Sequence, residues 1–128
     1  MDASAAIELV LSRAAATPLK ALLKNEVLRV PVHFDAEVYG GIRRMIRRRE
    51  LRDAEALEGL FSVRRLRLQR VAIVPLVPQA FALRDRFAAY DAFYAVVARL
   101  SGATLVTCDR GLARAAEGYC EVKYFALR

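Results

Sequence analysis

Four carboxylates stand at or near the start of predicted helices, although they are far apart in the chain: Asp2, Glu37, Asp91 and Asp109. Ligands of parallel α/β sheets bind beyond the carboxyl ends of the strands, where helices begin. Acids at such junctions can therefore meet at one site. Crowded carboxylates repel one another unless a cation neutralises them, and Mg²⁺ and Mn²⁺ prefer oxygen ligands. The pattern predicts one acidic site for a divalent metal.

Each acid could also have a purely structural role. Asp109 follows an apolar stretch and would cap a helix, which is worth about 1 kcal/mol. Asp91, the sole acid of AAYDAFYAVVARL, would be favoured by the positive end of its helix. Glu37 could pair with a nearby arginine, and Asp2 could lie on a solvated terminus. The metal-site hypothesis therefore depends on the four acids together.

Other reactive residues give weaker signals. His33 is the single histidine, which argues against histidine-dependent triads, and we expect it to be structural, at the end of a strand. Cys108 is expected to be a buried structural thiol. With Cys120 it makes only two cysteines, too few for a disulfide framework. The pair Gly40-Gly41 lies inside a predicted helix, so it indicates close packing against a helix of this chain or of a second subunit.

The predicted elements alternate along the chain. Apolar spacing and capping residues predict helices over 4–11, 15–23, 35–49, 53–70, 78–86, 90–100 and 110–117. Asp35, Asp53 and Asp109 are the predicted caps of three of these helices. Strands are predicted over 28–33, 71–77, 103–107 and 120–125. Such alternation indicates a mainly parallel sheet covered by helices on both faces.

Chain length, apolar runs and net charge limit the possible classes of protein. A chain of 128 residues is expected to form one domain, residues 1–128. It has no apolar run of about 20 residues, the length of a membrane span, and no features of a signal peptide, so we expect a cytoplasmic protein. The net charge is +7, and arginine strongly outnumbers lysine. Arginine favours a phosphate-bearing partner, although a GC-rich genome would also enrich arginine and alanine.

Three segments resemble PIN-domain ribonucleases of the VapC toxin type: DASAAIEL, DAEVYGGIRRM and LRDRFAAYDAFYAVVARLSGATLVTCDRGLARA. The resemblance implies a PIN-like three-layer α/β/α sandwich with a mainly parallel central sheet. It also implies that the four acids named above are the catalytic and metal-binding residues. Ser4 and Thr107 match positions that often line that site with a polar side chain.

The same resemblance implies a function. The protein would be a Mg²⁺- or Mn²⁺-dependent endoribonuclease, the toxin component of a type II toxin–antitoxin pair. It would hydrolyse RNA by metal-activated water and leave a 5′-phosphate and a 3′-hydroxyl. A cognate VapB-type antitoxin, a homodimer and a higher toxin–antitoxin assembly are the implied partners. The candidate RNA-binding residues are Arg43, Arg44, Arg47 and Arg84, for which a solvated helix face is the alternative.

One departure from the family pattern concerns the N-terminus. Family members usually have a short apolar strand before the first aspartate, whereas only Met1 precedes Asp2 here. Either the native start lies upstream of Met1, or the first strand is truncated, which would expose sheet edges. If the short strand misplaces Asp2, the alternative is a catalytically impaired PIN-fold RNA-binding protein. A small-molecule phosphatase is disfavoured because DAS lacks an Asp-x-Asp pair.

Overall fold

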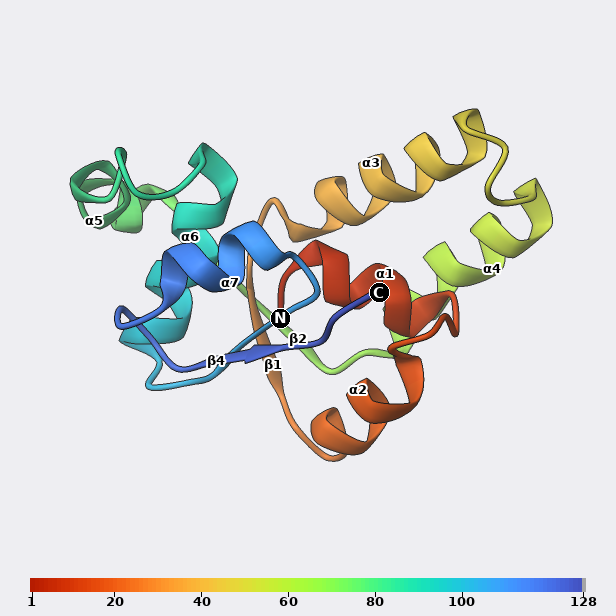
Figure 1. The fold of residues 1–128 in the computed structure, drawn as a ribbon, viewed down its shortest axis with the longest axis horizontal. Coiled ribbons are helices and arrows are strands. Elements are labelled where there is room, and N and C mark those ends of the chain that lie inside the picture. Colours follow the sequence, from red (N-terminus) through yellow and green to blue (C-terminus); the bar gives the residue numbers. More distant parts are fainter. Residues whose placement is uncertain (128) are drawn as a thin grey trace.

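The computed structural model describes residues 1–127 and has an α/β architecture (Figure 1). The α-helices are α1 (Ala3–Val10), α2 (Ala16–Leu23), α3 (Phe34–Arg47), α4 (Asp53–Ser62), α5 (Val77–Ala82), α6 (Ala89–Leu100) and α7 (Arg110–Ala116). The strands are β1 (Leu28–Pro31), β2 (Leu68–Val71), β3 (Leu105–Thr107) and β4 (Val122–Tyr124). Short 3-10 turns, η1 (Val63–Arg65) and η2 (Val74–Leu76), precede β2 and α5. None of these helices combines the length and apolar character needed to cross a membrane.

The strands form two parallel pairs in place of one continuous sheet. Strand β1 pairs with β2, with Leu28 opposite Leu68, and β3 pairs with β4, with Leu105 opposite Val122. Helix α6 packs against both β1 and β3 and so joins the two pairs. The predicted α/β class and the parallel pairing are confirmed, with the predicted central sheet divided in the middle.

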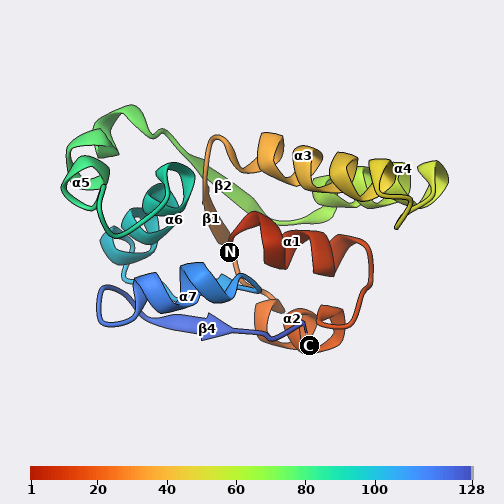
Figure 2. The same ribbon diagram turned by 45° about the horizontal axis from the view of Figure 1, so that its top comes forward.

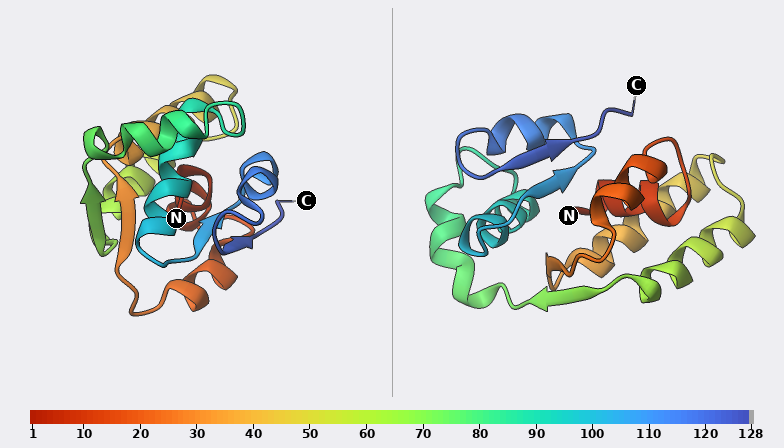
Figure 3. Two further views of the ribbon diagram at one scale, coloured as in Figure 1. Left: turned by 90° about the vertical axis from the view of Figure 1, so that its left-hand side faces the viewer. Right: turned by 90° about the horizontal axis from the view of Figure 1, so that it is seen from below.

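The division lies where the chain begins. Figure 3 shows the N-terminus between the two strand pairs. The backbone N–H of Asp2 donates to the carbonyl of Val106 at 3.0 Å, a single strand-like bond. Beside it, a hollow of about 490 Å³ is lined by Leu28 of β1, Leu105 of β3 and Met1. This arrangement agrees with the expectation of a truncated first strand. The Met1 amino group is buried here, and burial lowers its pKa.

Helix α3 carries part of the site and is fixed by an apolar stripe. Phe34, Val38 and Ile42 are buried at helical spacing, the pattern of a helix that buries one face. Gly41 lies so close to the Ile7 side chain of α1 that a methyl group at this position would collide with it. The predicted close packing at the glycine pair therefore involves a helix of the same chain. Figure 2 shows α3 and α4 side by side, extending away from the strands.

Two predicted caps are wrong, Asp35 by two residues and Asp53 by one. Helix α3 begins at Phe34 with His33 in the capping position, so Asp35 lies in the first turn. Its carboxylate accepts two hydrogen bonds from Arg70, at 2.6 and 2.7 Å. Helix α4 begins at Asp53 itself, and Arg52 occupies the capping position. The Asp109 cap is confirmed.

The segment between α4 and α5 differs most from the prediction. The helix predicted over 53–70 ends at Ser62, and the strand predicted over 71–77 is instead found at Leu68–Val71. Pro75 lies inside the predicted strand, but proline cannot donate to a strand ladder, and here it lies in the 3-10 turn η2. The helix predicted over 78–86 is shorter, as are the strands predicted over 103–107 and 120–125.

Candidate active site

The four acids predicted from the sequence line one hollow of about 460 Å³, which we call the acid cup. Asp2 reaches it from the start of α1, Glu37 from α3, Asp91 from the first turn of α6, and Asp109 from the start of α7. Each lies in the first turn or the capping position of its helix, where the positive helix end favours an anion. The local capping role and the shared site are therefore compatible.

Asp2 is held by a network of short hydrogen bonds. Its carboxylate accepts from the hydroxyls of Ser4, at 2.8 and 2.9 Å, and Thr107, at 2.8 Å, and from the backbone N–H of Ala5 at 3.1 Å. Burial raises the pKa of Asp2, and these hydrogen bonds oppose that shift. Ser4 and Thr107, the two polar residues named with the acids, thus both contact Asp2, and Thr107 is fully buried.

Thr107 also connects Asp2 to Asp109. The backbone N–H of Asp109 donates to the Thr107 hydroxyl at 2.9 Å, and one oxygen of Asp109 accepts from the backbone N–H of Leu112 at 3.0 Å. The neighbouring backbone N–H of Cys108 donates to the Ser4 hydroxyl at 3.0 Å. The two hydroxyls thus tie the start of the chain to the end of β3, although a continuous first strand is lacking there.

The pKa of Asp91 is affected by the negative charges of the other acids. Its pKa is raised to about 6, first by burial and then by the negative charges of Asp109, Asp2 and Glu37. Nearby like charges disfavour the ionised form. Asp91 therefore lies within the electrostatic reach of the other three acids of the cup.

Glu37 has two neighbours that the sequence pattern did not assign to the site. Its Oε1 atom lies 2.8 Å from Nδ1 of His33 and accepts a hydrogen bond from the Tyr94 hydroxyl at 2.7 Å. Burial, followed by the Glu37 carboxylate, raises the pKa of Tyr94 far above its usual range. His33 was expected to be a structural residue at the end of a strand, and Tyr94 was not singled out. The sequence signal for His33 was its position four residues before Glu37, and the signal for Tyr94 was its position three residues after Asp91.

The predicted RNA-binding arginines divide into two groups. Arg44 lines the acid cup, and its guanidinium lies near Gly40 and Gly41, which have no side chains to displace it. Arg43 and Arg47 are on α3 but do not line this hollow. Arg84 lies with its guanidinium 4.4 Å above the Phe81 ring. Only Arg44 of the four is brought to the acids.

The donor set fits a hard divalent cation. All four acids offer carboxylate oxygens, and Mg²⁺ typically takes one or two carboxylates and retains several waters. Within residues 1–127, no three acidic, histidine or cysteine side chains lie close enough to one another to hold a metal ion by themselves. The cup therefore provides carboxylates near a common space, and a cation there would complete its coordination with water and substrate oxygens.

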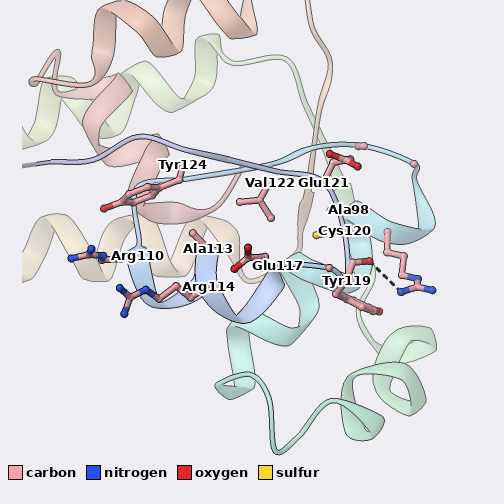
Figure 4. A pocket seen from close by; sticks show the side chains of 14 residues that line it. Ala98, Arg110, Ala113, Arg114, Glu117, Tyr119, Cys120, Glu121, Val122 and Tyr124 are labelled. Carbon is pink, nitrogen blue, oxygen red and sulfur yellow. Dashed lines mark hydrogen bonds between the residues drawn. The ribbon is translucent and has the colours of Figure 1, made fainter.

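A second and wider hollow, of about 840 Å³, lies between α6, α7 and β4 (Figure 4). Arg110 and Arg114 extend in the same direction on one side of it, with Tyr124 nearby. None of the four acids lines this hollow.

Cys108 is buried, and burial followed by the charges of Asp2 and Glu8 raises its pKa to about 11. The burial agrees with the predicted buried thiol.

Comparison with known proteins gives matches over most of the chain. A family described as PIN domain matches residues 1–118. Ribonuclease VapC12 of Mycobacterium tuberculosis is 33% identical over 126 residues, 98% of each chain. VapC ribonuclease Mb0985 of Mycobacterium bovis is 33% identical over 122 residues, 95% of this chain and 94% of that protein. Ribonuclease VapC3 of Mycobacterium tuberculosis is 34% identical over 117 residues, 90% and 85% of the two chains.

Proposed function

Because the chain belongs to the PIN-domain family, we propose that it is an endoribonuclease dependent on Mg²⁺ or Mn²⁺, the toxin of a type II toxin–antitoxin pair. The observation that carries the proposal is the meeting of four sequence-distant acids in one hollow. Three of them raise the pKa of the fourth. An enzyme that holds a cation there has a reason to tolerate this repulsion, whereas a purely structural cluster does not.

The residues of the cup have distinct roles in this proposal. Asp2, Glu37, Asp91 and Asp109, which all line the hollow, would supply carboxylate oxygens to the cation. A Mg²⁺ or Mn²⁺ ion bound there would polarise the scissile phosphate and lower the pKa of a water for in-line attack. Arg44 lines the same hollow, and its guanidinium would bind a phosphate of the RNA through two N–H groups.

The alternative, a PIN-fold RNA-binding protein that does not cut, required a misplaced Asp2. Asp2 lines the same hollow as the other three acids, and the hydroxyls of Ser4 and Thr107 hold its carboxylate. This geometry favours the nuclease over the non-cutting protein.

The proposed partners follow from the family and from the surface. We expect RNA as substrate, a VapB-type antitoxin that blocks the acid cup, and a homodimer. Val74, Val77 and Phe81 of η2 and α5 expose 79%, 48% and 63% of their surface. Neighbouring exposed apolar side chains are typical of protein contacts, so this surface is our candidate for the contact with a second copy.

Cleavage of a defined single-stranded RNA by the purified protein tests the proposed function. We expect cutting at discrete positions with Mg²⁺ or Mn²⁺, and none with EDTA. Asp91→Asn should lower the rate by at least about 100-fold, since even residues that only orient metal ligands contribute about 10- to 100-fold.

Asp85→Asn is the matched control, because Asp85 is exposed, lies six residues from Asp91 and does not line the acid cup. Its rate should equal that of the unmodified protein. Equal cutting by the Asp91 and unmodified proteins would indicate a contaminating nuclease and reject the assignment of Asp91. RNA binding without cutting under every metal condition would favour the non-cutting alternative.

A further inference from the structure

One oxygen of Glu37 is fully engaged by the protein. Oε1 accepts a hydrogen bond from the Tyr94 hydroxyl at 2.7 Å and lies 2.8 Å from Nδ1 of His33. A carboxylate oxygen accepts hydrogen bonds, so the tautomer of His33 with its hydrogen on Nδ1 is the one that forms this second bond. Within residues 1–127 no group donates to Oε2. The two oxygens of one carboxylate therefore have different environments.

Both donors are fixed by their surroundings. Tyr94 exposes only 3% of its surface, and the His33 side chain exposes 13%. The His33 ring lies among three aromatic rings, with centroid distances of 5.1 Å to Tyr90, 5.8 Å to Phe93 and 5.3 Å to Tyr94. The imidazole has little freedom to turn, so the direction in which Nδ1 donates is set by packing.

The histidine is a poor choice for packing alone. Its Nε2 atom is buried and has no hydrogen-bond partner among residues 1–127, and a buried polar atom without a partner destabilises the folded state. Phenylalanine would fill the same aromatic surroundings without that cost. What the imidazole adds is the Nδ1 hydrogen bond to Glu37, which holds one oxygen of this carboxylate in place.

Glu37 needs such support because its neighbours repel it. Asp91, Asp2 and Asp109 line the same hollow, and a glutamate side chain has several rotatable bonds through which it could turn away from like charges. Two donors on Oε1 oppose that rotation. Tyr94 is three residues after Asp91 on α6, so one helix turn carries both a cup acid and the group that orients another.

We propose that His33 and Tyr94 are positioning residues that hold Oε1 of Glu37 and thereby present Oε2 to a divalent cation in the acid cup. The inference rests on the proposed function, since it assigns these residues to the same metal site. It predicts that the two donors control metal affinity more than they control folding.

The test measures Mn²⁺ binding to the full chain by isothermal titration calorimetry, without RNA, together with the thermal midpoint in EDTA. Tyr94→Phe and His33→Phe each remove one donor and keep a ring. Loss of a partner that orients a metal ligand typically weakens metal affinity by 10- to 100-fold, so we expect each variant to bind Mn²⁺ roughly 10-fold more weakly. The midpoint of His33→Phe should be equal or higher, because the unpartnered Nε2 is gone.

Two comparisons separate positioning from packing. His33→Asn places an amide N–H near the former Nδ1 but loses the ring, so it should retain more Mn²⁺ affinity than His33→Phe despite lower stability. Tyr39→Phe is the matched control, because Tyr39 lies on the same helix as Glu37, exposes 57% of its surface and does not line the cup. In a Glu37→Gln background, Tyr94→Phe should have little further effect on Mn²⁺ affinity.

The outcomes distinguish this inference from the proposed function. Unchanged Mn²⁺ affinity in both phenylalanine variants, with metal-dependent RNA cleavage by the unmodified protein, would overturn the positioning role alone. Affinity losses that follow the thermal midpoints, with His33→Asn the weakest binder, would show a packing role and also overturn it. An unmodified protein that neither binds Mn²⁺ nor cuts RNA would overturn both.

Discussion

At the scale of single residues, Asp91 shows the conflict between folding and function in the acid cup. Burial and the charges of Asp109, Asp2 and Glu37 raise its pKa from 3.8 to about 6. A raised carboxyl pKa means that the folded protein holds this proton more tightly than the unfolded chain does. The associated stability is present on the acidic side and is lost as the pH rises from about 4 through about 6.

The corresponding prediction concerns the stability of Asp91→Asn without metal. The amide is neutral at every pH, so the variant should be more stable than the unmodified protein at pH 7.5, by about 1 kcal/mol after allowance for solvent screening at this half-buried site. The difference should fall toward zero at pH 4. Thermal melts in EDTA across this pH range measure it. A constant difference would show that Asp91 ionises in the folded protein as it does in the unfolded chain.

The residues of the cup were predictable to different degrees. Asp91 and Asp109 could be identified because an acid on an apolar helix, or directly after a strand, stands out against its apolar neighbours. The sequence also offers the spacing between His33 and Glu37, but many polar pairs have this spacing. Only the packing of α6 against β1 brings Tyr94 to Glu37, a contact between residues 57 positions apart. Such a contact has no local signature in the sequence.

At the scale of elements, the errors cluster where tertiary contacts decide the structure. Val63 and Leu66 continue the helical spacing of α4, so the pattern predicted a helix to residue 70. The chain instead turns at Val63–Arg65 and forms β2, whose backbone pairs with β1. The gain from that ladder depends on a strand almost 40 residues earlier, so local propensity could not reveal it. Elements bounded by a cap, such as α7, were predicted closely.

The two adjacent glycines of α3 provide a test at this scale. Alanine is favoured over glycine inside a helix by up to about 1 kcal/mol. At Gly40 an added methyl group would lie 3.7 Å from the Arg44 guanidinium, an ordinary contact, whereas at Gly41 it would collide with Ile7 of α1. We expect Gly40→Ala to be equally or more stable than the unmodified protein, and Gly41→Ala to be less stable than Gly40→Ala by about 1–2 kcal/mol. Urea unfolding measures both, and equal stabilities would contradict the close α1–α3 contact.

At the scale of the whole molecule, the sheet is divided beside the N-terminus, yet Asp2 still reaches the acid cup. In the described residues, the backbone N–H of Asp2 donates to the carbonyl of Val106 in β3, and this is the one backbone bond between them. A strand would ordinarily fix the first acid by its ladder of hydrogen bonds. Here the side chains of Ser4 and Thr107 fix it. The local network thus maintains the position of Asp2, while the missing pairing leaves a hollow between β1 and β3.

The net charge of +7 leads to the last prediction, which concerns RNA binding and salt. Arginine–phosphate contacts release counterions, so log affinity for single-stranded RNA falls with log salt by about 0.7 per phosphate contact. In the non-cutting Asp91→Asn background, Arg44→Ala should weaken binding of unrelated RNA sequences to a similar extent and reduce this slope by about 0.7, because Arg44 lines the cup.

Arg84→Ala is the matched control for Arg44. The Arg84 guanidinium lies over the Phe81 ring and donates to the Phe81 carbonyl at 3.1 Å, so it is already engaged by a residue of α5, and Arg84 lies outside the lining of the cup. Its removal should change the slope less than removal of Arg44 does. Fluorescence anisotropy with a labelled RNA, measured from about 50 to about 300 mM salt, gives both slopes. If the two variants lose equal affinity and slope, RNA is attracted by the total charge of the protein and not by a specific arginine at the acids. A larger effect of Arg44 would fix the path of the RNA backbone at the rim of the acid cup, within reach of the carboxylates.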